Sequence, residues 1–273
     1  MQIGPELRLK LKALLLGGKF DYLFPSPNRS VHVFCVGLPR SGTHTLAYIF
    51  SRNYAAAHEP NTAATIVNIL DWFHQKYSKT TMLKILSCRD KILKLDIESS
   101  HYLHHISDLL VEKFPQAKFI LTVREPMSWL ESEVNQNYLT RNKGMWRALE
   151  EYRYSKYNYE HEFSNLKDMR NIYPIRSYLS YWKDHISTVL TNVPSERLLV
   201  IDTFKLSHEI NNIASFLGDE GITIDKDKQH SGKMPKKIKL YDKLDQNKIR
   251  ELVQIHCQDF IQKNLPFMNS YII

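Results

Sequence analysis

The segment Val33–Leu46 constrains the fold more than any other part of the chain. An apolar run, Val33–Val36, is followed by a short turn that contains Gly37, Pro39 and Gly42, and then by a helix-like segment. Glycines permit positive φ, which lets backbone N–H groups converge, and the N-terminus of the following helix adds the positive end of its dipole. The segment therefore predicts a strand, an anion-binding loop and a helix.

This loop departs from the loop of nucleoside triphosphatases. That loop reads G-x-x-x-x-G-K-[ST]; Gly37 and Gly42 keep the glycine spacing, but Thr43 and His44 stand in place of the lysine and the magnesium-binding hydroxyl. Arg40 offers a planar fork of N–H donors instead, which suits a phosphosulfate group held without a metal. The candidate anion-binding residues are Pro39, Arg40, Ser41, Gly42, Thr43, His44 and Thr45.

Strand-like and helix-like segments alternate along the chain, which predicts an α/β fold with a parallel sheet covered by helices on both faces. We expect strands or extended segments at 32–37, 54–60, 91–96, 117–123 and 197–202, and helices at 6–16, 43–52, 62–77, 102–114, 175–191, 206–217 and 246–263. The 273 residues fit one domain, residues 1–273, with residues 1–30 as an N-terminal helical extension.

Residues 133–181 break this alternation, because they are polar, helical in propensity and rich in aromatic side chains. Two interpretations stay open. The segment is an acceptor-binding lid, or it is a helical insertion that uses its tyrosines as core and rim. We favour the second for most of the tyrosines and the first for a few.

The net charge indicates the kind of ligand, and the cysteines indicate the cellular compartment. With 37 basic and 29 acidic residues the net charge is +8, which favours an anionic ligand. Cys35, Cys88 and Cys257 are odd in number and form no C-x-x-C pair, so we expect reduced thiols and a cytoplasmic location. No apolar run reaches the roughly 18 residues of a membrane span, and no signal peptide is visible.

Two segments together resemble the sulfotransferases that use 3′-phosphoadenosine 5′-phosphosulfate (PAPS). The stretch Gly37–Thr43 is similar to their 5′-phosphosulfate loop, and Ala117–Ser132 is similar to their 3′-phosphate segment, a strand that ends in Arg and Pro with a serine eight residues after the arginine. Residues 197–218 also resemble the family's strand and its helix ending in Phe-Leu-Gly, and 230–233 resemble a C-terminal loop over the cofactor. The resemblance is good over 31–125 and loose over 175–260.

The resemblance implies a P-loop-like sulfotransferase fold, PAPS as donor, 3′-phosphoadenosine 5′-phosphate (PAP) as product, and a small-molecule or glycan acceptor. It implies that Arg124 and Ser132 hold the 3′-phosphate, and that Ser231, Gly232 and Lys233 help to cover the donor. The arginine at position 40 and a carboxylate base make the chain more similar to the carbohydrate and tyrosylprotein sulfotransferases than to the cytosolic aryl and steroid type.

Two residues compete for the role of base. Glu59 leaves an extended segment close to the loop, and Pro60 excludes helix there; it resembles the carboxylate base of the related enzymes. His101 is the alternative. Lys94, at the end of the strand expected over 91–96, is the candidate for stabilising the leaving phosphate, together with Arg40. The histidines at 101, 104 and 105 lack the carboxylate or cysteine partners of a zinc site, so we expect no metal.

Other functions remain open at this point. A P-loop nucleotide kinase or NTPase is the main alternative, although the missing lysine argues against it. A binder of nucleic acid would use the positive charge, but the chain lacks the basic and aromatic surface pattern of such modules, so we expect no nucleic-acid partner.

Overall fold

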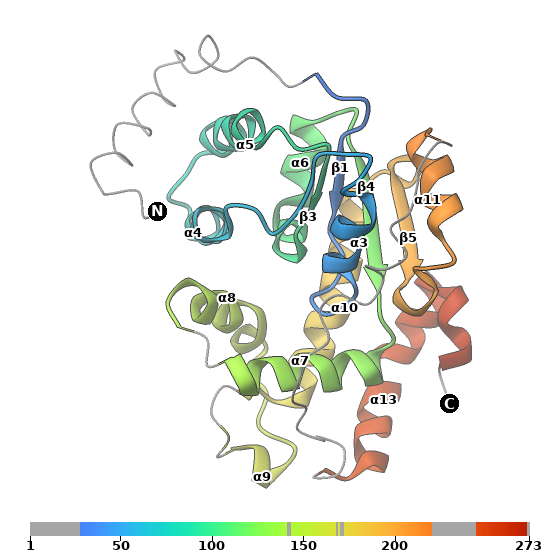
Figure 1. Cartoon of the computed structure of the whole chain (residues 1–273). Helices are drawn as coiled ribbons and strands as arrows, with labels where there is room; N and C mark the ends of the chain where they lie inside the picture. Colours follow the sequence, from blue (N-terminus) through green and yellow to red (C-terminus); the bar gives the residue numbers. More distant parts are fainter. Residues whose placement is uncertain (1–27, 141–142, 168, 170–171, 220–243, 272–273) are drawn as a thin grey trace.

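A five-stranded parallel sheet forms the centre of the molecule, in the order β2-β3-β1-β4-β5 (Figure 1). The structure is a computed structural model, and it describes residues 28–140, 143–167, 169, 172–219 and 244–271. The strands are β1 (Val33–Cys35), β2 (Ala56–His58), β3 (Ile97–Ser99), β4 (Lys118–Val123) and β5 (Leu198–Asp202). The predicted α/β fold class with a parallel central sheet is confirmed.

Helices follow the strands on both faces of the sheet. They are α3 (Thr43–Phe50), α4 (Thr62–Phe73), α5 (Lys79–Leu93), α6 (Ser107–Lys113), α7 (Pro126–Thr140), α8 (Met145–Tyr154), α9 (Ser164–Lys167), α10 (Ile175–Asn192), α11 (Ile210–Leu217) and α13 (Gln246–Asn264), with a 3₁₀ segment, η1 (His101–Ile106), between β3 and α6. Every helix expected within the described residues is present, with shifted ends. None of these helices is long and apolar enough to cross a bilayer.

The strand order places a topological switch point between β1 and β4. From β1 the chain turns to β2 at one edge of the sheet, and from β4 it turns to β5 at the other edge. In open parallel sheets ligands bind beyond the carboxyl ends of the strands at such a point. In Figure 1 the arrowhead of β4 points toward α7, so α7 and α8 lie beyond this end of the sheet. The loop after β1 and the residues after β4 meet there.

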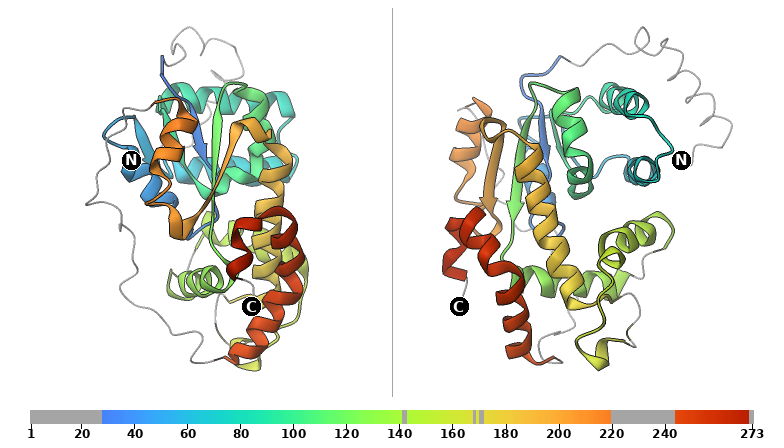
Figure 2. Two further views of the ribbon diagram at one scale, coloured as in Figure 1. Left: turned by 90° about the vertical axis from the view of Figure 1, so that its right-hand side faces the viewer. Right: turned by 180° about the vertical axis from the view of Figure 1, so that it is seen from behind.

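Two apolar clusters cover the two faces of the sheet. The smaller one packs α3 and α11 against the sheet through Leu46, Ile49 and Ile213. The larger one packs α6 and α10 on the other face and continues into α7, α8 and α13, which Figure 2 shows from two further sides. Helix α13 contacts both α10 and α7. The segments beyond the carboxyl ends of the strands therefore share one core with the sheet.

Most aromatic side chains of residues 133–181 belong to that core. Tyr154, Tyr178 and Tyr181 are buried completely or almost so, and Tyr173 is 8% exposed. These four tyrosines lie in the core, whereas Tyr138 is 38% exposed.

The strand expected over 91–96 is wrong. Helix α5 continues to Leu93, and Lys94 ends it in the left-handed conformation with φ 51°. The apolar residues there belong to the last turn of a helix, and Ile92 is 53% exposed, unlike a residue of a central strand. Lys94 precedes β3 and lies at the amino end of the sheet, the end opposite to the loop.

Some expected elements lie outside the described residues. These are the helix at 6–16, most of the extension at 1–30, and the C-terminal loop with Ser231, Gly232 and Lys233.

Gly37 allows β1 and β4 to stay in contact where the loop begins. Val36 N donates to Ile120 O at 2.9 Å, and Leu38 N donates to Thr122 O at 3.1 Å. A Cβ atom on Gly37 would lie 1.8 Å from Thr122 Oγ1 and 2.9 Å from Thr122 N. A side chain at this position would force the loop away from β4.

We expect Gly37→Ala to destabilise the fold by about 3 kcal/mol, at the upper end of typical overpacking costs. Adding Thr122→Ala should restore stability in part, because it removes the shorter contact and leaves the contact with the backbone nitrogen. Thermal unfolding of the wild type and both variants measures this. Equal melting temperatures for the wild type and Gly37→Ala would show that the close approach is unimportant.

Candidate functional site

Protein side chains hold the loop between β1 and α3 through its carbonyl groups. The four consecutive carbonyls of residues 38–41 each accept a side-chain hydrogen bond. Leu38 O accepts from Ser41 Oγ (2.5 Å), and Pro39 O accepts from Trp129 Nε1 (2.9 Å). Arg40 O accepts from Arg124 Nη1 (3.3 Å), and Ser41 O accepts from Thr203 Oγ1 (2.9 Å). These donors come from the loop itself, from α7 and from the ends of β4 and β5.

The loop ends at a helix N-terminus without a side-chain cap. Arg40 and Gly42 have φ values of 63° and 90°, and the first turn of α3 contains no acidic residue. The first N–H groups of a helix have no intrahelical acceptor, and the helix dipole favours an anion beside them. Thr43, His44 and Thr45 form this first turn. These features are compatible with the anion-binding role expected for this loop, which stays a prediction.

Ser41 supports the loop from within. Its side chain is fully buried, and its hydroxyl contacts Leu38 O and lies 2.7 Å from Thr122 Oγ1. The backbone N–H of Ser41 donates to Leu38 O at 3.2 Å. Ser41 is among the ligand-binding residues predicted from the sequence, but these internal bonds engage both of its donors.

A second cationic group lies where β4 ends. Arg124 Nε donates to Ser128 Oγ at 2.8 Å, and the Arg124 guanidinium lies 5.7 Å from the ring centroid of Phe204. Ser132, one turn after Ser128 on α7, accepts a hydrogen bond from Arg40 Nε at 3.3 Å. The structure brings together the three residues predicted from the sequence, with Arg40 in contact with both Arg124 and Ser132.

The two candidate bases lie side by side. Glu59 follows β2, and its Oε1 atom lies 2.8 Å from Nδ1 of His101, the first residue of η1. His58 lies between Glu59 and the loop: its Nε2 atom is 3.7 Å from Glu59 Oε1 and 3.2 Å from Thr43 Oγ1. A continuous polar connection thus runs from the first residue of α3 to His101.

The surroundings of Glu59 keep it ionised, and burial keeps His58 neutral. Burial alone would raise the pKa of Glu59, but the contact with His101 and the charge of Arg153 outweigh it, so the pKa lies below its ordinary value. Burial lowers the pKa of His58 to about 4, although Glu59 opposes this shift. At neutral pH the site therefore contains a carboxylate with a neutral imidazole on the side of the loop.

Helix α8 contributes two side chains to this region. The ring of Trp146 stacks on His101 with centroids 6.0 Å apart, and the guanidinium of Arg153 lies 5.2 Å from the ring centroid of Tyr181. Arg153 is 3% exposed, and its Nε and Nη2 atoms have no hydrogen-bond partner in the described part of the chain. A buried guanidinium in this state costs free energy unless a ligand or water pairs with it.

Lys94 does not join this site, because it lies at the opposite end of the sheet. Ser231, Gly232 and Lys233 cannot be placed, because they lie outside the described residues. Within residues 28–140, 143–167, 169, 172–219 and 244–271, no three histidine, cysteine, aspartate or glutamate side chains form a group that fits a metal ion.

A sequence model described as a sulfotransferase domain matches residues 32–221, more than half of the chain. The chain belongs to the sulfotransferase family. No curated protein matches its sequence significantly.

Three solved structures are similar to this sulfotransferase over most of its length. A sulfotransferase from Alicyclobacillus acidocaldarius has 15% identity and a TM-score of 0.49, with 90% of this chain and 96% of that chain covered. The sulfotransferase domain of the Synechococcus PCC 7002 olefin synthase has 14% identity and a TM-score of 0.40, with 85% and 97% covered. A mouse sulfotransferase complexed with PAP has 17% identity and a TM-score of 0.34, with 94% and 85% covered.

Three residues of this sulfotransferase's candidate site were not predicted from the sequence: Ser128, His58 and Arg153. Ser128 lies four residues before Ser132 on α7, and this spacing places both hydroxyls on one helix face. Arg153 follows Trp146 by seven residues on α8, which puts a charged side chain on the buried face of that helix. For His58, which precedes Glu59 at the end of β2, the sequence carries no comparable signal.

The pKa of His58 predicts a pH-dependent stability. An unfolded histidine titrates near pH 6.5 and folded His58 at about 4, so between these values the unfolded chain binds more protons and stability rises with pH. We expect the melting temperature to fall on acidification from pH 6.5 to 4, and to fall less steeply in His58→Gln. Buried His104, His105 and His185 contribute equally to both proteins, so parallel curves would contradict this role of His58.

Proposed function

We propose that this sulfotransferase moves the sulfuryl group of PAPS to a hydroxyl or amine of a small-molecule or glycan acceptor and releases PAP. The observation that supports this proposal most is a pair of cationic groups, one on each side of the β1–β4 switch point. One is the loop with Arg40 and the uncapped start of α3, and the other is Arg124 with Ser128. PAPS carries two separate anionic ends, a 5′-phosphosulfate and a 3′-phosphate, which this pair fits.

The proposed reaction is an in-line displacement at sulfur. The acceptor oxygen forms a bond to sulfur while the bond between sulfur and the 5′-phosphate oxygen breaks, and PAP leaves with that electron pair. The acceptor proton passes to a base of the protein. Charge that develops on the leaving phosphate is stabilised by Arg40 and the N-terminus of α3. Lys94 is omitted from this step because of its position.

Glu59 is the proposed base, with His101 as a positioning partner. The lowered pKa of Glu59 keeps it ionised at neutral pH, and its side chain is more exposed than that of His101, at 20% against 7%. The alternative is His101 as the base with Glu59 orienting its ring. Both assignments depend on the same contact, in which Glu59 Oε1 lies 2.8 Å from His101 Nδ1.

The acceptor is proposed to bind beside α8, where Trp146 lies against His101 and Arg153 has unpaired N–H groups. In this proposal, one face of α8 has the acceptor-binding role that was predicted for a part of residues 133–181. We include no metal and no nucleic acid in the proposal, and we retain the cytoplasm as compartment because the three cysteines are free and buried.

The first test is donor binding measured by calorimetry. We expect PAP to bind tightly in the presence of EDTA and ATP to bind weakly with or without magnesium. Arg124→Met should weaken PAP binding roughly 10- to 100-fold, the value of a charge-assisted hydrogen bond. Arg52→Met, which alters an exposed arginine after α3, is the matched control. Tight magnesium-dependent ATP binding would favour a nucleotide kinase or NTPase instead.

The second test separates the two candidate bases. Acceptors are first found by incubation with PAPS and a metabolite and glycan library, with mass spectrometry for products that gain one sulfuryl group. We expect Glu59→Gln to lower kcat by about 10²- to 10⁴-fold, the usual contribution of a general base, and to leave PAP affinity unchanged.

The pH profile of kcat gives an independent criterion. With Glu59 as base the rate should stay constant from pH 8 to below pH 5, because its pKa is lowered. A rate that falls on acidification well above pH 5 would argue against Glu59 as the base. Near-normal turnover in Glu59→Gln, together with inactivity of His101→Ala, would assign the base to His101.

A further inference from the structure

The turn that carries Glu59 has an unusual backbone. Glu59 and Asn61, on either side of Pro60, have φ values of 49° and 52°. Residues other than glycine adopt this left-handed region at a cost of about 1–3 kcal/mol each, and they stay there only where their surroundings impose it. Something in the structure must therefore hold residues 59–62.

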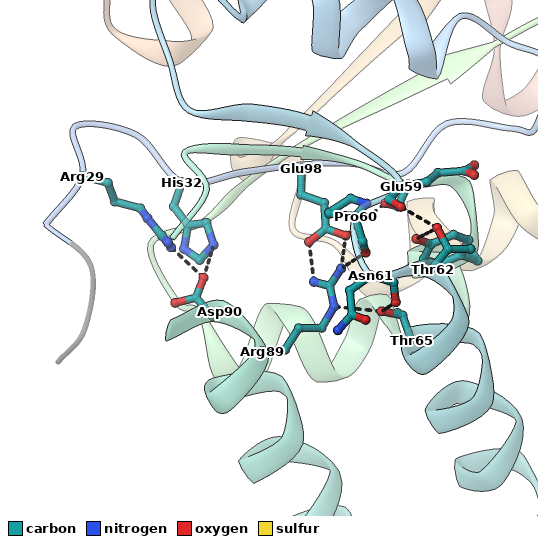
Figure 3. Close-up of polar contacts among 12 residues, drawn as sticks. Arg29, His32, Glu59, Pro60, Asn61, Thr62, Thr65, Arg89, Asp90 and Glu98 are labelled. Atoms are coloured by element: carbon teal, nitrogen blue, oxygen red, sulfur yellow. Dashed lines mark hydrogen bonds and ion pairs between the residues drawn. The ribbon is translucent and has the colours of Figure 1, made fainter. Parts of the chain in front are cut away.

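Three side chains hold this turn through three consecutive carbonyls. Thr62 Oγ1 donates to the carbonyl of residue 59, Arg89 Nη2 to that of residue 60 at 3.1 Å, and Thr65 Oγ1 to that of residue 61 at 3.0 Å. Figure 3 shows Arg89 reaching the turn from α5. Thr62 and Thr65 are local to α4, so Arg89 is the only distant member of this set.

Arg89 is itself fixed by a buried carboxylate. Nη1 and Nη2 of Arg89 both bond to Glu98 of β3, the second at 2.6 Å, and Nε donates to Thr65 Oγ1 at 2.9 Å. The two side chains are 9% and 5% exposed. Ser100 Oγ adds a bond to Glu98 Oε1 at 3.0 Å. One guanidinium thus joins β3, α4, α5 and the turn (Figure 3).

A buried ion pair of this kind seldom increases stability over apolar residues of the same size, because removing both charges from water is costly. Its advantage is the fixed geometry of the planar guanidinium, which sets the directions of all its bonds. Here one of those bonds, from Arg89 Nη2, ends on the backbone carbonyl of Pro60, next to Glu59.

We propose that the Arg89–Glu98 pair is a positioning device that fixes the turn 59–62 and so places the Glu59 carboxylate against His101 and beside His58. The proposal rests on the proposed function for its catalytic meaning. The part of the proposal that concerns structure, that the pair keeps the turn 59–62 ordered, does not depend on which reaction the protein catalyses. Arg89 and Glu98 act through Glu59 and do not touch the substrate.

The test replaces the pair by apolar residues, Arg89→Met with Glu98→Leu, because the core stays filled and only the polar bonds are lost. We expect kcat to fall about 10- to 100-fold, the effect of misplacing a catalytic group by about 1 Å, with PAP affinity within about twofold of the wild type. Hydrogen exchange measured by mass spectrometry should increase over residues 56–65 and stay unchanged in the loop 37–43.

A second variant and a matched control complete the design. Arg89→Lys keeps the charge but loses the planar fork, so it should lower kcat and increase exchange in the same segment. The control replaces the ion pair of the next residue on α5, Asp90, with Arg29 of the segment before β1, as Arg29→Met with Asp90→Asn. Arg29 Nη1 lies 2.7 Å from Asp90 Oδ1, and the pair does not reach the turn (Figure 3). It should leave kcat and the exchange of 56–65 unchanged.

The outcomes separate this inference from the proposed function. Wild-type exchange over 56–65 and wild-type kcat in both Arg89 variants would overturn the positioning role. A fall in kcat that merely follows the melting temperature, equally in the control pair, would also overturn it. If the wild type shows no turnover with PAPS, the proposed function fails, and the exchange measurement still decides whether the pair orders the turn.

Discussion

The orientation of four peptide groups determines what the loop after β1 presents to a ligand. In a trans peptide the carbonyl and the following N–H point in opposite directions, so a carbonyl bonded on one side directs the next N–H to the other. This applies to the N–H groups of Arg40 and Gly42, because Pro39 has no N–H and the N–H of Ser41 donates to Leu38 O. The carbonyls of 38–41 are all bonded by side chains. The strand order makes this possible, because β4 lies beside β1 and β5 follows β4, which brings Arg124 and Thr203 to the loop. The sheet thus sets the loop's chemistry as well as its place.

The turn after β2 is built in the same way. There too, consecutive carbonyls accept side-chain bonds, and residues other than glycine adopt positive φ: Arg40 in the loop, Glu59 and Asn61 in the turn. Both segments lie at the carboxyl edge of the sheet, and Ser99 connects them, because its hydroxyl donates to Thr43 O and its carbonyl accepts from Glu59 N. The loop and the turn are therefore both held by side-chain bonds to their carbonyls, and Ser99 joins them directly.

Local patterns in the sequence were sufficient for four of the five strands and for the turn after β1, because glycine spacing and apolar runs report on nearby residues. They failed where the partner is distant. The hydroxyl of Ser41 is engaged by Thr122, 81 residues away, and nothing near Ser41 indicates this. Over 91–96 an apolar run of this length fits a helix end as well as a strand. Arg89 and Glu98 looked like ordinary charges, since only the tertiary structure brings the Pro60 carbonyl to the guanidinium.

The neutral state of His58 resolves an electrostatic conflict in the proposed reaction. A carboxylate base must work close to an anionic donor, and a protonated His58, 3.7 Å from Glu59, would attract both and weaken the basicity of the carboxylate. Burial prevents this by lowering the pKa of His58 to about 4. His58 then contacts Thr43 Oγ1 as a neutral group and separates Glu59 from the loop. On its other side the Glu59 carboxylate contacts His101, with Oε1 2.8 Å from Nδ1.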